Sequence, residues 1–452
     1  MKRFFTSIAL VSLAVVSFAG GLLTNTNQSA SFVRNPARYA SLETDAIYFN
    51  PAGTAFFNEG WSFSANWQMI WQQRDAINLQ NNNKKYDGKV YVPCMPTLFA
   101  AYKTGDWTFS GFFGMPGGGG KAEFNNGLPL FDNLIGGLGQ SFGSLAPVPL
   151  NISGASQFES TQYMFALQLG AAYKISENLS AYAGVRTNYI SNNYNGTIKA
   201  VADLSALQMG KMDLMTVNLD MDQSGIAFAP IVGLDYKVGN FNFAAKYEFR
   251  AVTNIENSNS NPKIADIKAN EQVDALMPGT SNMIMTMGGG ALGQYLGGFA
   301  DGNTLRSDAP ALLSLAGSWQ ALPRLQVMAG WNYYFDKDAK IESLMGGDNM
   351  RKLSRNTIEY LCGAEYKVTD KLLLSAGIQF SNFGINDTYT SDLAFINDSF
   401  LTGVGGKYSL TEKVDINFGY CYANYAPDNN MVTGTRYERK THNATIGVDF
   451  RL

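Results

Sequence analysis

Few side chains in this sequence are suited to acid–base or nucleophilic chemistry. The one histidine, His442, stands at the start of the last expected strand and in its outward-facing phase, away from any triad partner or zinc ligand. Cys94, Cys362 and Cys421 are odd in number and widely spaced, which indicates small strand residues and not a disulfide framework or a metal site. The sequence therefore predicts no catalytic residue and no metal.

A glycine run and a set of charged residues could indicate a phosphate-binding loop and a catalytic or binding cluster, respectively. Gly117 to Gly120 follow an expected strand but open no helix, so they lack the setting of a phosphate-binding loop. A set of charged residues could form a catalytic or binding cluster, or it could form structural ion pairs between a strand wall and an inner segment. Its members are Arg186, Lys246, Glu248, Arg250 and Asp449. We expect ion pairs, and therefore neither an enzyme nor a cofactor.

Methionines gather in two stretches that are expected to be long loops. An exposed loop this apolar must pack against something or bind something. Methionine suits promiscuous apolar surfaces because it is flexible and polarisable. We interpret the loops as a capture groove for hydrophobic ligands; two loop helices that pack on each other are a compatible alternative. The residues are Met209, Met212 and Met215 in the first loop and Met277, Met283, Met285 and Met287 in the second.

The composition of the 452 residues indicates a β-barrel in a membrane. Charged residues make up 16%, where about a quarter is usual in soluble domains, and aromatic residues make up 13%. No apolar run after the N-terminus reaches the roughly 18 residues of a membrane helix. This combination is typical of transmembrane β-barrels. The net charge of -3 indicates no polyanionic partner, so we expect no binding to nucleic acid.

The N-terminal residues have the pattern of a secretory signal peptide followed by a short inner segment. A basic pair precedes an apolar stretch, and small residues before Ala19 fit cleavage after that residue. We expect residues 1–19 to be the signal peptide and residues 20–58 to form a plug. The plug contains a turn at Asn50, Pro51, Ala52 and Gly53, because Pro fixes one backbone angle and Gly permits unusual ones.

Period-two alternation of apolar with polar or small residues dominates residues 59–452. The polar face carries mostly Ser, Asn and Gln, where a soluble sandwich would carry more Lys and Glu, and this favours a barrel lumen. Fourteen strands are expected, near 60–78, 89–103, 106–116, 160–174, 179–191, 223–237, 241–255, 308–321, 324–336, 355–367, 371–382, 400–409, 414–424 and 441–452.

Short and long connections alternate along these strands, as they do in bacterial outer-membrane barrels. The longest expected loops are 117–159, 192–222 and 256–307. An even number of strands places both chain ends on the side of the short turns, so the plug enters the lumen from the periplasm. We therefore expect an all-β fold, a 14-stranded antiparallel transmembrane β-barrel with the plug inside its lumen, in the outer membrane of a Gram-negative bacterium.

The plug and the strand pattern resemble the FadL-type outer-membrane transporters, a family that moves long-chain fatty acids and aromatic hydrocarbons. The resemblance covers essentially the whole mature chain, although its specific motif is short. The family's Asn-Pro-Ala motif, in its N-terminal hatch, maps onto Asn50, Pro51 and Ala52. The earlier Asn35-Pro36-Ala37 lacks the acidic lead-in, and we interpret it as no part of the motif.

The third expected strand contains residues that interrupt a β-ladder. Pro lacks a donor and Gly favours irregular backbone angles, so both mark a bulge or a break. The resemblance implies more, because the family's third strand bends inward and opens a gap in the barrel wall. We expect the kink and the lateral gap at Gly111, Gly114, Pro116, Gly117 and Gly118.

The patterns together favour passive uptake of hydrophobic small molecules, such as fatty acids or aromatic hydrocarbons, with a lateral exit at the third strand. We expect a monomer that contacts outer-membrane lipid and lipopolysaccharide. Two alternatives stay open. One is a structural or surface-adhesion barrel that transports nothing, and the other is an outer-membrane lipase, which the outward phase of His442 disfavours.

Overall fold

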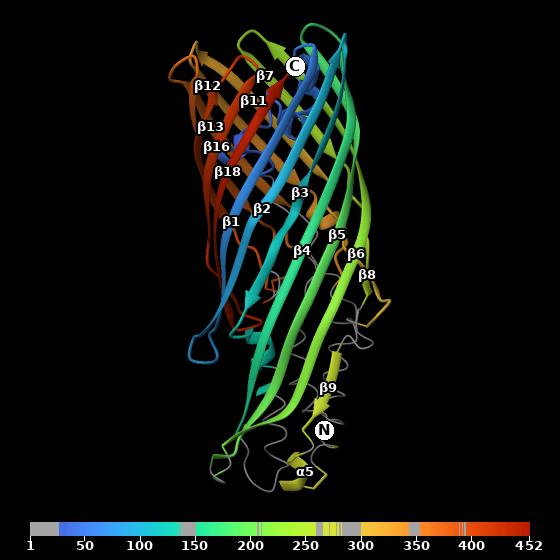
Figure 1. Cartoon of the computed structure of the whole chain (residues 1–452), viewed down its shortest axis with the longest axis vertical. Coiled ribbons are helices and arrows are strands. Elements are labelled where there is room, and N and C mark those ends of the chain that lie inside the picture. The colour runs from blue at the N-terminus through green and yellow to red at the C-terminus, as the bar shows by residue number, and fades with distance from the viewer. Residues whose placement is uncertain are drawn as a thin grey trace.

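A computed structural model shows a closed antiparallel β-barrel of 14 strands with the plug in its lumen (Figure 1). The structure describes residues 27–133, 135–136, 151–205, 208, 210–258, 265–270, 272–276, 278–279, 282, 300–342, 353–387, 389–390, 392 and 395–452. The expected signal peptide, residues 1–19, lies outside the described residues.

The wall strands follow one another in chain order, and the ring closes where β18 pairs with β1. They are β1 (Gly60–Asn78), β2 (Lys84–Thr104), β3 (Trp107–Phe124), β4 (Asn151–Lys174), β5 (Leu179–Asp203), β6 (Lys211–Val238), β7 (Phe241–Glu248), β11 (Leu312–Leu322), β12 (Leu325–Tyr334), β13 (Thr357–Lys367), β14 (Leu372–Asn382), β15 (Ser399–Ser409), β16 (Val414–Tyr425) and β18 (Thr435–Arg451). Shorter elements are β8 (Asn254–Ser258), β9 (Ala265–Ala269), β10 (Thr304–Arg306), β17 (Asp428–Asn430), α5 (Gln272–Leu276) and η6 (Asp336–Asp338).

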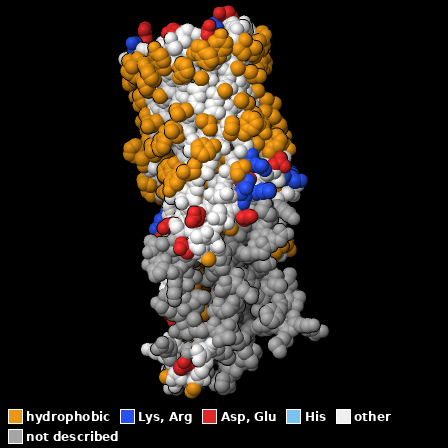
Figure 2. Space-filling view, turned by 90° about the vertical axis from the view of Figure 1, so that its right-hand side faces the viewer, with side chains coloured by type: hydrophobic (Ala, Val, Ile, Leu, Met, Phe, Trp, Pro, Cys, Tyr) orange, Lys and Arg blue, Asp and Glu red, His pale blue; other side chains and the backbone are white. Residues whose placement is uncertain are grey.

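The predicted 14-stranded barrel is confirmed, because the alternation in sequence becomes an alternation of burial. On β1, Asn66 and Gln68 are buried on the inner face, whereas Trp67 and Met69 are exposed on the outer face. Apolar side chains cover much of the outer wall in Figure 2. Within the described residues, no helix has the length and apolar character needed to cross a membrane.

Four neighbouring strands, β3 to β6, are longer than the sequence predicts. The expected loop over 192–222 is wrong, because β5 continues to Asp203 and β6 begins at Lys211. The expected loop over 117–159 is also too long, since β3 continues to Phe124 and β4 begins at Asn151. In Figure 1, β4, β5 and β6 project beyond the rest of the wall at the end opposite the C-terminus.

The plug lies near the end of the barrel that carries the C-terminus (Figure 1) and contains α2 (Ala30–Arg34), α3 (Ala46–Phe49) and the 3-10 helix η2 (Pro51–Phe56). Its apolar side chains form one core with the wall. Phe32 stacks on Phe49 with ring centroids 4.8 Å apart, and Tyr48 packs on Phe112 of β3 at 4.7 Å. The plug and the wall therefore share a core, and the plug positions side chains inside the lumen.

Candidate functional site

Asn50 joins the turn of the plug to the barrel wall. Its Oδ1 accepts a hydrogen bond from the Gly53 amide at 3.3 Å. Its Nδ2 donates to the Asp235 carboxylate of β6 at 2.5 Å and to the Ser41 carbonyl at 3.0 Å. A side chain at Gly53 would displace the Asn50 amide, since a Cβ there would lie 2.4 Å from Asn50 Nδ2. The Asn-Pro-Ala-Gly residues thus form a tight turn that is bonded to the wall.

Other wall side chains donate to backbone carbonyls of this turn and of helix α3 just before it. A buried carbonyl without a partner costs free energy comparable to a lost hydrogen bond, so these donors stabilise the plug in place. The pairs are Gln168 with Ile47 at 2.9 Å, Lys246 with Tyr48 at 2.9 Å and Ser180 with Ala52 at 2.8 Å. The second half of the plug is therefore held by β4 to β7.

The first half of the plug is held by a charge network of six residues, Arg34, Arg38, Glu43 and Asp45 of the plug with Glu365 of β13 and Lys407 of β15. Both arginine side chains are fully buried and contact the same Glu365 oxygen, at 2.8 Å from Arg34 and 2.7 Å from Arg38. Three cations face three carboxylates, so the charge network is neutral.

Glu43 stays ionised because of the cations around it in the charge network. Burial alone would raise the pKa of Glu43, but the positive charges of Lys407, Arg38 and Arg34 outweigh burial and hold that pKa well below its ordinary value. The ion pairs of Glu43 are consequently intact at neutral pH.

The charged residues that the sequence grouped separate in space. Arg186, Lys246 and Glu248 form ion pairs, with Glu248 at 2.6 Å from Arg186 and 2.7 Å from Lys246, but these pairs lie within the wall, on β5 and β7, and do not bridge wall and plug as we expect. The Arg186 guanidinium also lies 4.4 Å from the ring centroid of Tyr48 in the plug. The other two residues have other neighbours: Arg250 lies 3.9 Å from Asp308, and Asp449 accepts from Asn417 at 2.8 Å.

Asn35, which the sequence pattern left without a role, is fully buried against the wall. Its Oδ1 accepts from the Ala37 amide at 3.1 Å. A Cβ at Gly363 of β13 or Gly377 of β14 would lie 2.0 or 2.7 Å from this oxygen. Glycine at these two inward positions lets the plug approach the wall closely. The signal in the sequence is an inward-phase glycine on each of two neighbouring strands.

Strands β2 and β3 do not pair along part of their length. Their ladder stops after the Leu98–Phe113 pair and resumes at the Val90–Ala122 pair. Residues 91–97 of β2 and 114–121 of β3 therefore form an interruption in the wall, which we call the β2–β3 gap. The interruption therefore lies on the third strand, where the sequence predicts an irregular ladder.

The expected irregularity of the third strand is present on its other side too. The ladder between β3 and β4 shifts register between Gly114 and Gly117 and again between Gly118 and Gly120, and each bulge places one extra residue on β3. Gly118 and Gly120 have φ angles of +74° and +123°, which glycine adopts far more readily than other residues. Gly111 lies outside the irregular part, since it pairs with both Ala100 and Leu169.

Two prolines of β2, which the sequence analysis did not single out, also line the gap. Pro93 and Pro96 lie in the unpaired stretch, and proline leaves no amide donor unsatisfied there. The sequence feature that could have revealed them is the pair of prolines in Val92-Pro93-Cys94-Met95-Pro96, inside an expected strand. Side chains fill the space between the strands, because Met115 packs with Ile70, Val92 and Met95.

The plug also reaches the gap. Gln28 Nε2 donates to the Met115 carbonyl at 3.0 Å, and Thr97 Oγ1 donates to the Gln28 carbonyl at 2.5 Å. A backbone carbonyl of β3 at the gap is thus satisfied by the plug, and the Thr97 side chain of β2 bonds to the plug backbone.

Two of the predicted loop methionines are described, and neither lies in a loop. Met212 and Met215 belong to β6 and not to a loop, because the extension of β5 and β6 replaces the expected loop. Met215 is buried, whereas Met212 is only partly buried. Met209, Met277, Met283, Met285 and Met287 lie outside the described residues.

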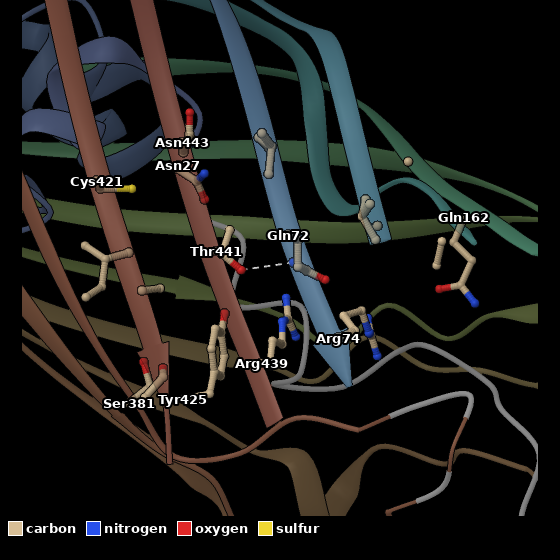
Figure 3. A pocket seen from close by; sticks show the side chains of 18 of the residues that line it. Asn27, Gln72, Arg74, Gln162, Ser381, Cys421, Tyr425, Arg439, Thr441 and Asn443 are labelled. Carbon is tan, nitrogen blue, oxygen red and sulfur yellow. Dashed lines mark hydrogen bonds between the residues drawn. The ribbon is translucent and has the colours of Figure 1, made fainter. Parts of the chain in front are cut away.

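A cavity of about 130 Å³ lies in the lumen beside the β2–β3 gap (Figure 3). Val90, Gly118 and Gly120 line it at the gap, and Arg74 and Arg439 line it from β1 and β18. A smaller cavity of about 60 Å³ lies between Tyr48 of the plug and the wall, with Pro116, Arg186 and Glu248 among its lining residues.

The histidine and the three cysteines, for which the sequence predicts no catalytic or metal-binding role, lie on strands β2, β13, β16 and β18. His442 is exposed, and its Nδ1 lies 2.7 Å from the Tyr420 hydroxyl oxygen. Cys94 and Cys362 are exposed, while Cys421 is buried and lines the larger cavity. Within the described part of the chain, no group of three or more His, Cys, Asp or Glu residues is placed to hold a metal ion.

Comparison with known proteins gives one family and several solved structures of similar fold. The family model described as an outer membrane protein transport protein (OMPP1/FadL/TodX) matches residues 10–448. No curated protein matches the chain.

Solved structures of similar fold share little sequence with this chain. A FadL homologue of Pseudomonas aeruginosa is 16% identical with a TM-score of 0.63, over 97% of this chain and 99% of that one. The toluene transporter TodX of Pseudomonas putida is 15% identical with a TM-score of 0.57, over 97% and 100%. The toluene transporter TbuX of Ralstonia pickettii is 16% identical with a TM-score of 0.50, over 90% and 94%. These likenesses support the barrel fold.

Proposed function

Because this chain belongs to the outer membrane protein transport family (OMPP1/FadL/TodX), we propose that it admits hydrophobic small molecules into its barrel and releases them sideways through the β2–β3 gap. The family is one of outer-membrane transport proteins and not of enzymes. The observation that carries the proposal is the interruption of the wall beside an internal cavity.

A lateral exit suits an apolar ligand. Such a ligand gains free energy by leaving the lumen for lipid and gains none by crossing a wet channel. Unpaired backbone is costly in lipid unless protein or a water-filled cavity satisfies it. The prolines of the β2–β3 gap remove donors, and Gln28 satisfies the Met115 carbonyl. The gap is thus an interruption that the chain can keep within a membrane.

The route begins outside the barrel at the methionine-rich segments and passes the larger cavity. Met212 and Met215 belong to the part of β6 that projects beyond the rest of the wall. We propose that the capture surface also includes Met209, Met277, Met283, Met285 and Met287. The cavity adjoins the gap through Val90, Gly118 and Gly120. We further propose that the barrel acts as a monomer in contact with outer-membrane lipid and lipopolysaccharide, and that Asn50 to Gly53 fix the plug beside this route.

Uptake of a neutral hydrocarbon tests the function. A Gram-negative host strain that makes the protein should take up radiolabelled toluene faster than the same strain without it, because the barrel bypasses the polar surface of the membrane. Uptake of a small sugar serves as the control and should not change, since the plug fills the lumen. Equal toluene rates at equal surface levels would contradict transport and leave the structural or adhesion barrel.

Replacing Asn50 should slow uptake while the barrel still assembles. In Asn50→Ala, the buried Asp235 keeps the Asn242 amide at 2.9 Å but loses Asn50, which costs about 1–3 kcal/mol. The turn then no longer holds Tyr48 against the wall beside the smaller cavity. Initial uptake rates and heat-modifiable migration measure the two outcomes. Asn58→Ala, at an exposed position after η2, is the matched control. Unchanged uptake would remove Asn50 from the mechanism.

A further inference from the structure

Five aromatic side chains form an unbroken series of ring contacts on the outer wall. Between centroids, the ring of Tyr247 lies 4.8 Å from that of Phe249 and 6.1 Å from that of Phe335. The ring of Tyr333 lies 4.9 Å from that of Phe335 and 5.5 Å from that of Trp331. The residues that alternate with Tyr247, Trp331 and Tyr333 along β7 and β12 are buried in the lumen, so the series faces outward. We call these five residues the aromatic shelf.

The aromatic shelf lies at the extracellular edge of the wall. It stands at the ends of β7 and β12 that lead into the connections 249–311 and 335–356, whereas the other ends of these strands join short turns. In outer-membrane barrels the long connections face the outside, and aromatic rings gather where hydrocarbon meets head groups. On the face seen in Figure 2, Lys and Arg side chains gather where the apolar belt of the wall ends. The aromatic shelf is therefore placed against the outer leaflet.

Two cations continue directly from the aromatic shelf. Arg250 follows Phe249, and Lys337 is exposed two residues after Phe335. The Arg250 side chain is 39% exposed, and its Nη1 donates to the carbonyl of Asp338, the residue after Lys337. Both positive charges are therefore at the same edge of the aromatic shelf.

A buried carboxylate holds the segments of this edge together. Asp308 is fully buried and accepts from the Thr253 amide at 3.1 Å and from the Lys340 amide at 3.2 Å. Arg306 Nε donates to it at 2.5 Å, and Arg250 Nε lies 3.9 Å away. One carboxylate thus fixes three segments and faces two arginines, so one positive charge stays unbalanced there.

Carboxylates do not balance the remaining cations at the surface. Lys337 and Lys340 are exposed, and among the described residues their side chains form no ion pair. Of the carboxylates in residues 335–342, Asp336 is buried, and Glu342 is half-buried and accepts from a backbone amide. This leaves Asp338 as the exposed carboxylate of that segment. The surface beside the aromatic shelf is therefore more positive than negative.

We propose that the aromatic shelf and the cations Arg250, Arg306, Lys337 and Lys340 bind lipopolysaccharide through lipid A, its phosphorylated and acylated anchor. The cations contact the phosphates, since arginine bonds phosphate through two parallel hydrogen bonds and basic clusters at a membrane surface attract anionic head groups. The rings contact the acyl chains where these meet the head group.

The number of cations favours lipid A over other outer-membrane lipids. A phosphatidylglycerol head carries one negative charge, whereas lipid A carries two phosphate groups on one sugar backbone. Four cations around one buried carboxylate match the second head better than the first. The site is formed by β7, β12 and the segments that follow them, so it is separate from the β2–β3 gap.

Binding of a matched pair of lipids to the assembled protein tests the site. Native mass spectrometry in detergent measures the affinity for lipid A and for the same lipid without its phosphates. Lipid A should bind more tightly. Arg250→Gln with Lys337→Gln should weaken lipid A about 25-fold, roughly fivefold for each cation lost near an anionic head, and should leave the dephosphorylated lipid within about twofold.

The matched control removes two lysines from the opposite end of the wall. Lys367 and Lys371 are exposed beside the short turn between β13 and β14. Lys367→Gln with Lys371→Gln changes the net charge by the same amount and should leave the lipid A affinity within about twofold. A loss as large as that of Arg250→Gln with Lys337→Gln would overturn the site, because it would reveal a nonspecific effect of charge.

The unaltered protein provides a second measurement that does not depend on the variants folding. A lipid that binds the folded barrel and not the unfolded chain raises the unfolding temperature. Lipid A should raise it more than phosphatidylglycerol does at equal concentration, and dephosphorylated lipid A should not raise it. An equal rise with phosphatidylglycerol would overturn the assignment to lipopolysaccharide, and no rise with lipid A would overturn the site.

The inference rests on the contact with lipopolysaccharide that is proposed together with the function, and not on transport. If lipid A binds no better than its dephosphorylated form while toluene uptake is as expected, the site fails and the proposed function stands. If lipid A binds as expected while toluene uptake equals that of the host without the protein, the site stands and transport fails.

Discussion

Removing one residue from each bulge of β3 should abolish hydrophobic uptake while the barrel still assembles. Each bulge gives β3 one residue more than β4 opposite it. A variant that lacks Pro116 and Gly119 would therefore have equal numbers of residues on the two strands. Strand β3 can then follow β4 without a bend, and its backbone returns toward β2. If ligands leave through the β2–β3 gap, toluene uptake should fall to the rate of the host without the protein.

The matched control keeps the number of residues. Pro116→Ala with Gly119→Ala leaves both bulges in place, so it should retain most of the uptake. Heat-modifiable migration shows whether each variant has assembled. A deletion variant that assembles and still takes up toluene at the full rate would contradict a lateral exit.

The natural cysteines allow the same exit to be obstructed from outside. Cys94 lies in the unpaired stretch of β2 and is exposed, whereas Cys362 is exposed on β13 at a fully paired position. A bulky apolar maleimide on Cys94, in a Cys362→Ser background, should slow toluene uptake. The same label on Cys362, in a Cys94→Ser background, should not. Equal effects of the two labels would argue against an exit at the gap.

The strands within the membrane could be predicted because two solvents impose the pattern. Strand β1 spans Gly60–Asn78, as expected, since lipid selects Trp and Phe on one face and the lumen selects Ser, Asn and Gln on the other. Where the strands project beyond the rest of the wall, this contrast disappears. On the extension of β5, Tyr194 and Ile198 are buried, but the residues between them are polar and read as a loop.

Some features of the candidate site depend on adjacent residues and could be predicted, whereas others depend on contacts between distant residues and could not. The turn at Asn50 and the bulges at Pro116 depend on the backbone preferences of adjacent residues, so the sequence reveals them. The contact of Asn35 with Gly363 and the pairing of Arg74 with Arg439 depend on register between segments hundreds of residues apart. A shift of one residue would send each of these side chains to the other face, and a single sequence does not fix that register.

Glu365 should matter more to the plug than any single hydrogen bond. One of its oxygens is shared by two arginines that are fully buried, so Glu365→Gln leaves the charge network with three cations and two carboxylates. Removing one partner of a buried ion pair costs about 3–5 kcal/mol, because the remaining charge stays without compensation. We expect the first half of the plug to loosen, which should expose it to protease and admit small sugars that the native barrel excludes.

Two further variants distinguish lost charge balance from a general defect. Glu438→Gln on the outer face of β18 breaks a partly exposed pair with Arg436, which is worth about 0–1 kcal/mol, so plug protection should not change. Arg34→Gln combined with Glu365→Gln returns the charge network to two cations and two carboxylates, so protection should be largely restored. Protease protection that stays at the native level in Glu365→Gln alone would show that the charge network does not hold the plug, and that the bonds to Asn50 and its neighbours suffice.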